Sequence, residues 1–165
     1  MRVGIALGSN LGDRLANLRA ARQVITDLVG AKSQLISPLY ETEPVNCEPG
    51  AGKFLNAVIE IEYDGDPTEL LGELIRAEES LGRKRGHDRN VSRTIDIDLL
   101  YADELNVQNE QLQLPHPRLH LRKFVLQPLA DIRPDLVLPN QTKTVSELLA
   151  ETEDSTKVTC FSKDW

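Results

Sequence analysis

The sequence predicts an α+β fold, in which helices pack on an antiparallel sheet and further elements follow toward the C-terminus. Three observations predict this fold. Residues 54–63 carry apolar side chains at every second position, as a strand with one buried face does. Residues 67–82 place apolar side chains at helical spacing behind a clear start signal. The elements also succeed one another in the order strand, helix, strand, strand, helix, strand.

The first half of the chain begins with an apolar run at 3–7, which predicts a short buried strand ending at Gly8. A helix is expected next, because apolar side chains recur on one stripe. That stripe consists of Leu11, Leu15, Leu18, Ile25 and Val29. Residues 35–42 predict a strand that Pro38 confines to a sheet edge or a bulge, because proline has no N–H to donate. The prolines and glycines of 43–53 predict a loop.

The middle of the chain has the strongest local signals. The strand expected at 54–63 has one apolar face, made of Leu55, Ala57, Ile59, Ile61 and Tyr63. The helix that follows is expected to start at Asp66, which can cap it, with Pro67 at its first position and Glu69 completing a capping box. Gly82 suits the C-terminal end of this helix.

The remaining elements are shorter. They are a basic loop at 83–92, a strand at 94–101, a hairpin at 105–114, a helix at 121–130 and a last helix opened by the capping box at Thr144. The order of the first six elements is that of the ferredoxin-like sandwich. We therefore expect an antiparallel sheet with helices on one face, C-terminal additions, and a single domain over 1–165.

Composition excludes several classes of function. The net charge of -7 argues against binding nucleic acid through the overall field of the protein. No stretch approaches the roughly 20 apolar residues of a membrane helix, and the first apolar run is too short for a signal peptide. Cys47 and Cys160 lie far apart and indicate neither a disulfide framework nor a zinc site. We expect a cytoplasmic monomer.

Asp96 and Asp98 are the first candidates for chemistry. Residues two apart in a strand project from the same face, with Cα atoms roughly 6.5 Å apart at about 3.3 Å per residue. Two carboxylates at that spacing suit Mg²⁺, which takes oxygen ligands and shares its sphere with phosphates, and they could bridge two ions. Ile95, Ile97 and Leu99 are expected to face the core. The alternative is a solvated strand face.

The neighbouring loop favours the metal site. Five cations stand within eleven residues, namely Arg83, Lys84, Arg85, Arg89 and Arg93, and Asp88 is the only acid among them. This loop leads directly into the strand that bears the aspartates, so cations and carboxylates must lie close together. A triphosphate bound through magnesium needs both. His116, with Arg118 and Arg122, adds further groups that suit a phosphate chain, although a histidine between prolines can equally be structural.

Other interpretations are weaker. Gly50-Ala51-Gly52-Lys53 fails the P-loop pattern, because Cys47 and Phe54 stand where that pattern requires Gly and Ser or Thr. A glycosyltransferase could use the aspartate pair for a nucleotide sugar, but it would alternate strands and helices throughout. A ferredoxin-like RNA-binding module would expose aromatic residues and a basic face. Few aromatic residues and the acidic net charge oppose that reading.

Several stretches of the chain together resemble the 6-hydroxymethyl-7,8-dihydropterin pyrophosphokinase family. The most specific is the run from Arg93 to Leu100. The supporting stretches are Ile5 to Gly12, Tyr40 to Val45, Phe54 to Val58, Leu81 to Arg83 and Leu114 to Arg118. The resemblance implies a ferredoxin-like fold and transfer of the pyrophosphoryl group of ATP to the hydroxymethyl oxygen of the reduced pterin, which leaves AMP. It makes ATP the co-substrate and Mg²⁺, as two ions, the cofactor.

The resemblance also implies roles for individual residues. Asp96 and Asp98 match the magnesium ligands and, with Arg83 and Arg93, the catalytic group. The positions expected to bind ATP are Glu78, Arg85, Arg89, Arg93, Leu99, His116 and Arg122. Those expected to bind the pterin are Thr42, Val45, Phe54, Asn56 and Phe124.

The chemistry of the side chains supports the positions expected to bind the pterin. Two aromatic rings, Phe54 and Phe124, can sandwich a flat pterin, and Asn56 offers both a donor and an acceptor to its amide-like edge. The loops at 44–53 and 83–92 are expected to close over the substrates. Where the family commonly carries Trp-Gly-Pro, this chain has Asn90-Val91-Ser92, so the contacts of that lid are expected to differ. Gln111 and Gln113 likewise replace the polar residues that relatives often carry in the hairpin.

Overall fold

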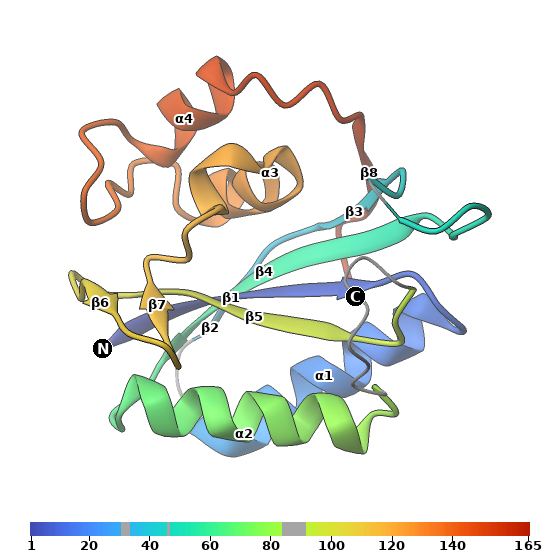
Figure 1. The fold of residues 1–165 in the computed structure, drawn as a ribbon, viewed down its shortest axis with the longest axis horizontal. Coiled ribbons are helices and arrows are strands. Elements are labelled where there is room, and N and C mark those ends of the chain that lie inside the picture. Colours follow the sequence, from blue (N-terminus) through green and yellow to red (C-terminus); the bar gives the residue numbers. More distant parts are fainter. Residues whose placement is uncertain (31–33, 46, 84–91) are drawn as a thin grey trace.

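A computed structural model describes residues 1–30, 34–45, 47–83 and 92–165 of the chain. Its centre is an antiparallel sheet in the order β5-β1-β4-β3-β8, in which β2 also pairs with β4 (Figure 1). The strands of this sheet are β1 (Arg2–Ser9), β2 (Gln34–Ile36), β3 (Leu39–Thr42), β4 (Phe54–Glu62), β5 (Asp96–Ala102) and β8 (Val158–Ser162). The order β5-β1-β4-β3, with a helix after the first and third of these strands in the chain, is the ferredoxin-like arrangement.

The remaining elements lie around this sheet. The helices are α1 (Arg14–Val29), α2 (Pro67–Ser80), α3 (Lys123–Ile132) and α4 (Val145–Glu151), with a short 3-10 turn η1 (Leu119–Leu121) before α3. A separate two-stranded hairpin is formed by β6 (Val107–Gln108) and β7 (Gln113–Leu114), as predicted. No helix in the described part of the chain is long and apolar enough to cross a membrane.

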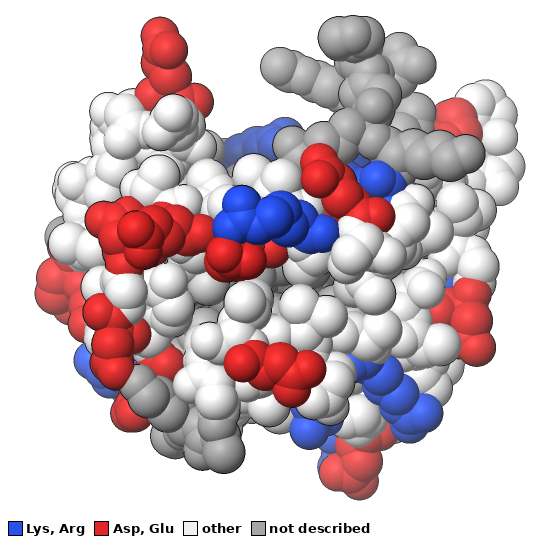
Figure 2. Space-filling model, turned by 90° about the horizontal axis from the view of Figure 1, so that it is seen from below, with Lys and Arg blue, Asp and Glu red and all other residues white. Residues whose placement is uncertain are grey.

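Helices α1 and α2 cover one face of the sheet, as predicted, and the C-terminal helices α3 and α4 cover the other. Figure 1 shows α1 and α2 below the sheet and α3 and α4 above it. The reason lies in β4, where the seven residues from 55 to 61 are all buried. The alternating residues Leu55, Ala57, Ile59 and Ile61 join the core under α1 and α2, whereas Val58 joins a second core under α3. Figure 2 shows the α1 and α2 side from below, with acidic side chains scattered over the part drawn in colour rather than a continuous basic patch.

Three further elements differ from the prediction. The strand expected at 35–42 is split into β2 and β3, because its register against β4 shifts by one residue around Ser37 and Pro38, which is the bulge that Pro38 predicted. There the Ser37 N–H donates to the Val58 carbonyl while the Val58 N–H donates to the Ser37 hydroxyl. Helix α1 begins at Arg14, capped by Asp13, so Leu11 lies before it and is exposed. Strand β8 was not predicted at all.

The predicted start of α2 is confirmed, although Glu69 does not complete a capping box there, and α3 begins at Lys123, two residues later than predicted. Asp66 accepts a hydrogen bond from the Thr68 N–H at the start of α2, with Pro67 as the first helical residue. At α4 the full capping box forms, in which Thr144 and Glu147 exchange side-chain and backbone bonds. Such caps satisfy N–H groups that have no partner inside the helix.

Gly4 on β1 leaves room for the ring of Tyr101, which belongs to the second core under α3. A Cβ added to Gly4 would lie 2.2 Å from the Tyr101 ring, so only glycine leaves room for that ring. The Tyr101 hydroxyl donates to Glu60 at 2.6 Å, and Arg133 at the end of α3 forms an ion pair with the same carboxylate. This buried network ties α3 to β4 and β5. It therefore fixes the position of α3 over the face of the sheet that carries the site.

Candidate active site

A cavity of about 610 Å³ opens on the α3 side of the sheet. Its volume lies within the range of about 300–1,000 Å³ that is usual for small-molecule sites. Strands β1, β4 and β5 contribute its floor, and the start of α3 and the segment before β8 contribute its walls. The lining residues are Ala6, Leu7, Gly8, Thr42, Glu43, Val45, Cys47, Phe54, Asn56, Ala57, Arg83, Arg93, Asp96, Asp98, Arg118, Arg122, Phe124, Val125, Asp154 and Thr156.

Gly8 lies at the centre of the floor. In the sheet register it pairs with Asn56 on β4 and with Asp96 on β5. A Cβ at this position would lie 3.4 Å from the Asn56 Oδ1 and 3.9 Å from both the Asp96 Cβ and the Phe54 ring. The hydrogen on Gly8 therefore leaves open the space where the polar strand β5 meets the aromatic and amide groups of β4.

The two aspartates project from β5 into this cavity, as the strand period predicted, while Ile95, Ile97 and Leu99 join the opposite core. Asp96 accepts hydrogen bonds from Arg83 at 2.6 Å and from Arg93 at 2.8 Å. Within the described part of the chain, no group donates a hydrogen bond to Asp98. Burial, reinforced by the charge of Asp96, raises the pKa of Asp98 to about 6. A cation at this point would relieve both effects.

Glu78 holds this arrangement together from α2. Its buried carboxylate accepts the Ile97 N–H at 2.6 Å, on the free edge of β5, and forms an ion pair with Arg83. Burial raises the pKa of Glu78, opposed by the Ile97 N–H and by Arg83. Glu78 does not line the cavity. It instead fixes the backbone between the two aspartates and the arginine that contacts Asp96.

Asn10, which sequence reasoning passed over, ties together the ends of both loops expected to close. Its backbone N–H donates to the Arg93 carbonyl, and its side-chain Oδ1 accepts the Arg93 N–H at 2.8 Å. Its Nδ2 donates to the Gly52 carbonyl and to the Ser92 hydroxyl. The Ser92 N–H also donates to Glu48 at 2.8 Å. Asn10 thus anchors the chain on either side of the cavity mouth. The signal available in the sequence was a polar residue directly after a predicted strand.

His116 is held as a neutral ring beside the cavity. The His116 backbone N–H donates to the Leu100 carbonyl at 2.7 Å, and the ring Nδ1 accepts the Arg118 backbone N–H at 3.2 Å. Burial first, and then the charges of Arg122 and Arg118, lower the pKa of His116 to about 4. With Nδ1 accepting, the proton of the neutral ring lies on Nε2, which makes Nε2–H the donor.

This lowered pKa predicts a pH effect on stability. Because the folded pKa of His116 lies below the ordinary value of 6.5, its neutral form favours folding above that pH. That stability is lost as the pH falls from about 6.5 toward 4, because in this range the His116 imidazole takes up a proton in the unfolded chain but stays neutral in the folded protein. We expect the His116→Asn variant to lose less stability than the wild type across this window, in urea unfolding at pH 7 and pH 4.5.

Asp98 does not affect the difference in stability between the wild type and His116→Asn. Its raised pKa acts in the opposite direction, since protonation from about pH 6 downward relieves the folded state, but it is present in both proteins. Parallel losses of stability in the two proteins would show that His116 is not held neutral.

The predicted pterin residues all line the other half of the cavity. The Asn56 Nδ2 donates to the Thr42 hydroxyl at 2.9 Å, which orients the amide with its Oδ1 toward the open space above Gly8. Phe54, at the start of β4, and Phe124, at the start of α3, also line the cavity, as does Val45. The Arg122 guanidinium lies 5.4 Å from the centre of the Phe124 ring.

The cavity brings together most of the residues predicted from the sequence. Those that line it are Arg83, Arg93, Asp96, Asp98, Arg122, Thr42, Val45, Phe54, Asn56 and Phe124. Glu78 and His116 lie behind it, and the Leu99 side chain is buried in the core on the opposite face, so only its backbone could meet a ligand. Arg85 and Arg89 lie outside the described residues.

Comparison with known proteins shows to which family this chain belongs. A family model described as 7,8-dihydro-6-hydroxymethylpterin-pyrophosphokinase (HPPK) matches residues 4–134. The chain belongs to this family. A 2-amino-4-hydroxy-6-hydroxymethyldihydropteridine pyrophosphokinase of Bacillus subtilis is 44% identical over 128 residues, covering 78% of this chain and 75% of that protein. One of Haemophilus influenzae is 40% identical over 151 residues, covering 91% and 92%.

A solved structure supports the fold. Plasmodium falciparum HPPK-DHPS matches with a TM-score of 0.67 at 14% identity. The match covers 90% of this chain and 44% of the solved one, so this chain spans less than half of that protein. At this identity the likeness establishes the ferredoxin-like fold alone.

Membership of the HPPK family confirms the reaction expected from the sequence. That reaction is pyrophosphoryl transfer from ATP to a hydroxymethyl-dihydropterin in folate biosynthesis. It sets aside the glycosyltransferase and RNA-binding readings.

Proposed function

We propose that this cavity binds magnesium-ATP at its β5 side and the reduced pterin at its β4 side, with Asp96 and Asp98 as the metal ligands. The observation that carries the proposal is the pair of carboxylates on one strand face, one of them half-buried with no hydrogen-bond donor among the described residues. Withdrawing a carboxylate from water without giving it a hydrogen-bond donor is costly. It is the kind of group that a divalent cation stabilises.

The donor set fits magnesium. Among the described residues no group of three or more histidine, cysteine, aspartate or glutamate side chains could enclose a metal. Two carboxylates facing an open cavity leave the other positions of the ion for water and substrate phosphates, which is how Mg²⁺ is usually held with nucleotides. We propose two ions, which when bound would neutralise charge on the phosphate chain.

The cations nearest the aspartates are proposed to contact the phosphates. Arg83 and Arg93 now pair with Asp96, and both line the cavity. With a metal on Asp96, these guanidinium groups would be released from part of that pairing and could meet phosphate oxygens in the same space. Arg122, which burial leaves with a lowered pKa, and the Nε2–H of His116 would approach from the α3 side. Arg85 and Arg89 are proposed to complete this set.

The pterin is proposed to lie between Phe54 and Phe124. Stacking on both ring faces suits a flat heterocycle. Asn56, oriented by Thr42, would read the polar edge of the pterin through its Oδ1 and its remaining amide hydrogen. The hydroxymethyl oxygen would then lie toward Gly8 and Asp96, where the two halves of the cavity meet.

Positioning and charge neutralisation then account for the chemistry. The hydroxymethyl oxygen attacks the β-phosphorus of ATP in line, and AMP leaves. No covalent bond to the protein is required. What this chain supplies is alignment of the oxygen with the phosphorus and a fixed array of donors around the charge that builds up.

A product assay tests the proposed function. The protein is mixed with ATP, the hydroxymethyl-dihydropterin and magnesium, and the nucleotide products are separated. We expect AMP and a pyrophosphorylated pterin, and no turnover when the magnesium is removed by a chelator. ADP would indicate an ordinary kinase, and turnover that persists without any divalent cation would contradict the metal site.

The floor of the cavity provides a prediction about substrate binding. Gly8→Val should raise the KM for the pterin by about tenfold or more, because two methyl groups would occupy the space between Asn56 and Asp96. Gly8→Ala, whose Cβ has only ordinary contacts, should have a smaller effect in the same direction. Steady-state kinetics with each substrate varied would check both, and an unchanged pterin KM in the valine variant would place the pterin elsewhere.

A further inference from the structure

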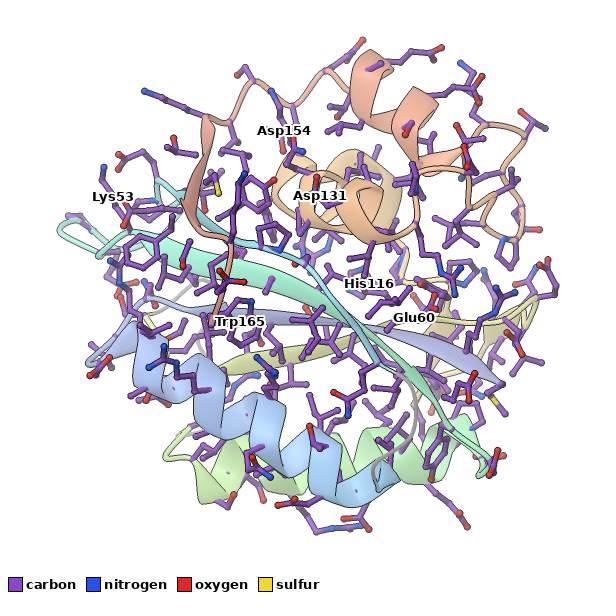
Figure 3. The ribbon with its side chains drawn as sticks, turned by 180° about the vertical axis from the view of Figure 1, so that it is seen from behind. Lys53, Glu60, His116, Asp131, Asp154 and Trp165 are labelled. Atoms are coloured by element: carbon purple, nitrogen blue, oxygen red, sulfur yellow. The ribbon has the colours of Figure 1, made fainter. Side chains whose placement is uncertain are left out.

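One wall of the cavity is made by residues that lie outside the matched family region. That match ends at residue 134, whereas Asp154 and Thr156 both line the cavity. They belong to the segment between α4 and β8, which crosses the start of α3 (Figure 3). Strand β8 then pairs with β3, with Val158 opposite Thr42. The segment therefore touches two of the elements that carry pterin-side residues, β3 with Thr42 and α3 with Phe124.

Asp154 makes the contact with α3. Its Oδ2 accepts the N–H of Lys123, the first residue of α3, at 2.8 Å. Its Oδ1 accepts the Thr156 N–H at 2.9 Å and also the Thr156 hydroxyl. Helix α3 has no side-chain cap from its own N-terminal residue, Arg122. The cap of this helix is thus supplied from 31 residues further along the chain.

The capped position lies between two residues of the proposed site. Arg122 precedes Lys123 and Phe124 follows it, and both line the cavity. The direction in which their side chains leave the backbone depends on how the first turn of α3 is set. A fixed hydrogen bond at Lys123 restrains that turn, because an uncapped helix end frays.

We propose that Asp154 is a positioning residue for the reaction, which sets the start of α3 so that Phe124 lies over the pterin. This inference rests on the proposed function. Both carboxylate oxygens of Asp154 are already occupied by Lys123 and Thr156. These bonds assign Asp154 to the alignment of α3.

Trp165, three residues after β8, holds that strand against the sheet. Its indole Nε1–H donates to the Ser37 carbonyl at 2.8 Å, at the turn between β2 and β3, and its ring lies 5.4 Å from the guanidinium carbon of Arg22. Together with the pairing of β8 and β3, this contact holds the segment against the sheet. Asp154 can then restrain α3 from a fixed point.

The test compares Asp154→Ala with a matched control, Thr144→Ala. Thr144 caps α4, far from the cavity lining, so its loss should lower stability without touching the site. We expect Asp154→Ala to raise the pterin KM on the order of tenfold. The ATP KM should rise much less, because Arg122 is one of several cations proposed to meet the phosphates, whereas Phe124 is one of only two rings proposed to hold the pterin. Thr144→Ala should lower Tm similarly and leave both KM values unchanged. Asp154→Asn should recover most of the wild-type pterin KM, because its amide oxygen can still accept the Lys123 N–H.

A second variant and a second readout keep the test decisive if Asp154→Ala folds poorly. Asp154→Glu keeps the charge but lengthens the side chain, so it should raise the pterin KM severalfold at a near-normal Tm. Hydrogen exchange at the Lys123 amide should quicken in the Asp154 variants and not in Thr144→Ala. A wild-type pterin KM in Asp154→Ala and Asp154→Glu, or equal increases in both KM values, would overturn the inference. Absence of pyrophosphoryl transfer in the wild type would instead contradict the proposed function.

Discussion

Replacing Asp98 by asparagine is expected to lower the rate of pyrophosphoryl transfer by at least about a hundredfold, while leaving the folded protein as stable as the wild type or more so. The activity falls because an amide is a poor ligand for Mg²⁺. Stability does not fall, because the substitution removes a half-buried charge whose pKa is raised by desolvation and by Asp96.

Asp96→Asn should have the same effect on activity and the opposite effect on stability. Asp96 accepts charge-assisted hydrogen bonds from Arg83 and Arg93 in the protein without metal. Removing its charge leaves those guanidinium groups without part of their compensation, so Tm should decrease. The pair of variants thus separates metal binding from folding.

Thermal unfolding without metal, together with steady-state kinetics, would check this pair. Equal stability losses in the two variants would mean that Asp98 also has a structural partner. Near-normal turnover in either variant at saturating magnesium would mean that the β5 carboxylates are not the metal ligands.

Glu78→Ala should have the largest effect on stability among the residues near the site, roughly 3 kcal/mol of unfolding free energy. The buried carboxylate satisfies the Ile97 N–H and pairs with Arg83, so its loss leaves two polar groups without that partner. Activity should also fall, because Ile97 lies between the two aspartates. Glu79→Ala, at an exposed position next along α2, is the matched control and should change stability by less than about 0.5 kcal/mol.

Glu78→Gln separates the two contacts of this residue, the hydrogen bond from the Ile97 N–H and the ion pair with Arg83. The amide oxygen can still accept the Ile97 N–H, while the charge that pairs with Arg83 is lost. We therefore expect a smaller loss of stability than in the alanine variant, together with a clear loss of activity if Arg83 must be held in place. Urea unfolding and kinetics on the three variants would check this. Equal stability of the alanine variants at 78 and 79 would show that Glu78 does not support β5.

Local patterns in the sequence predicted the elements that bury a regular face. The alternation at 54–63, the start signals at Asp66 and the capping box at Thr144 each led to an element in the expected place. The aspartates were placed correctly for the same reason, because a strand of period two puts Asp96 and Asp98 on one face whatever surrounds it.

Contacts between distant segments could not be predicted in this way. Strand β4 looks half-polar on the face that carries Asn56 and Glu60, but Asn56 is satisfied by Thr42 and Glu60 by Tyr101 and Arg133. That face therefore carries a second layer of helices. The cap supplied to α3 by Asp154 has no local signature either, since the residues it joins are 31 positions apart. The positions of Glu78 and His116 behind the cavity follow from such contacts too.

The most direct test of the account is to count divalent ions bound by Asp96 and Asp98. Mn²⁺ can replace Mg²⁺ and is detected by electron paramagnetic resonance, in the presence of the pterin and an α,β-methylene analogue of ATP that resists transfer. We expect two ions per wild-type chain, and fewer and weaker ones in Asp98→Asn and Asp96→Asn. The same number of ions with the same affinity in all three proteins would contradict the central claim that these carboxylates hold the metal.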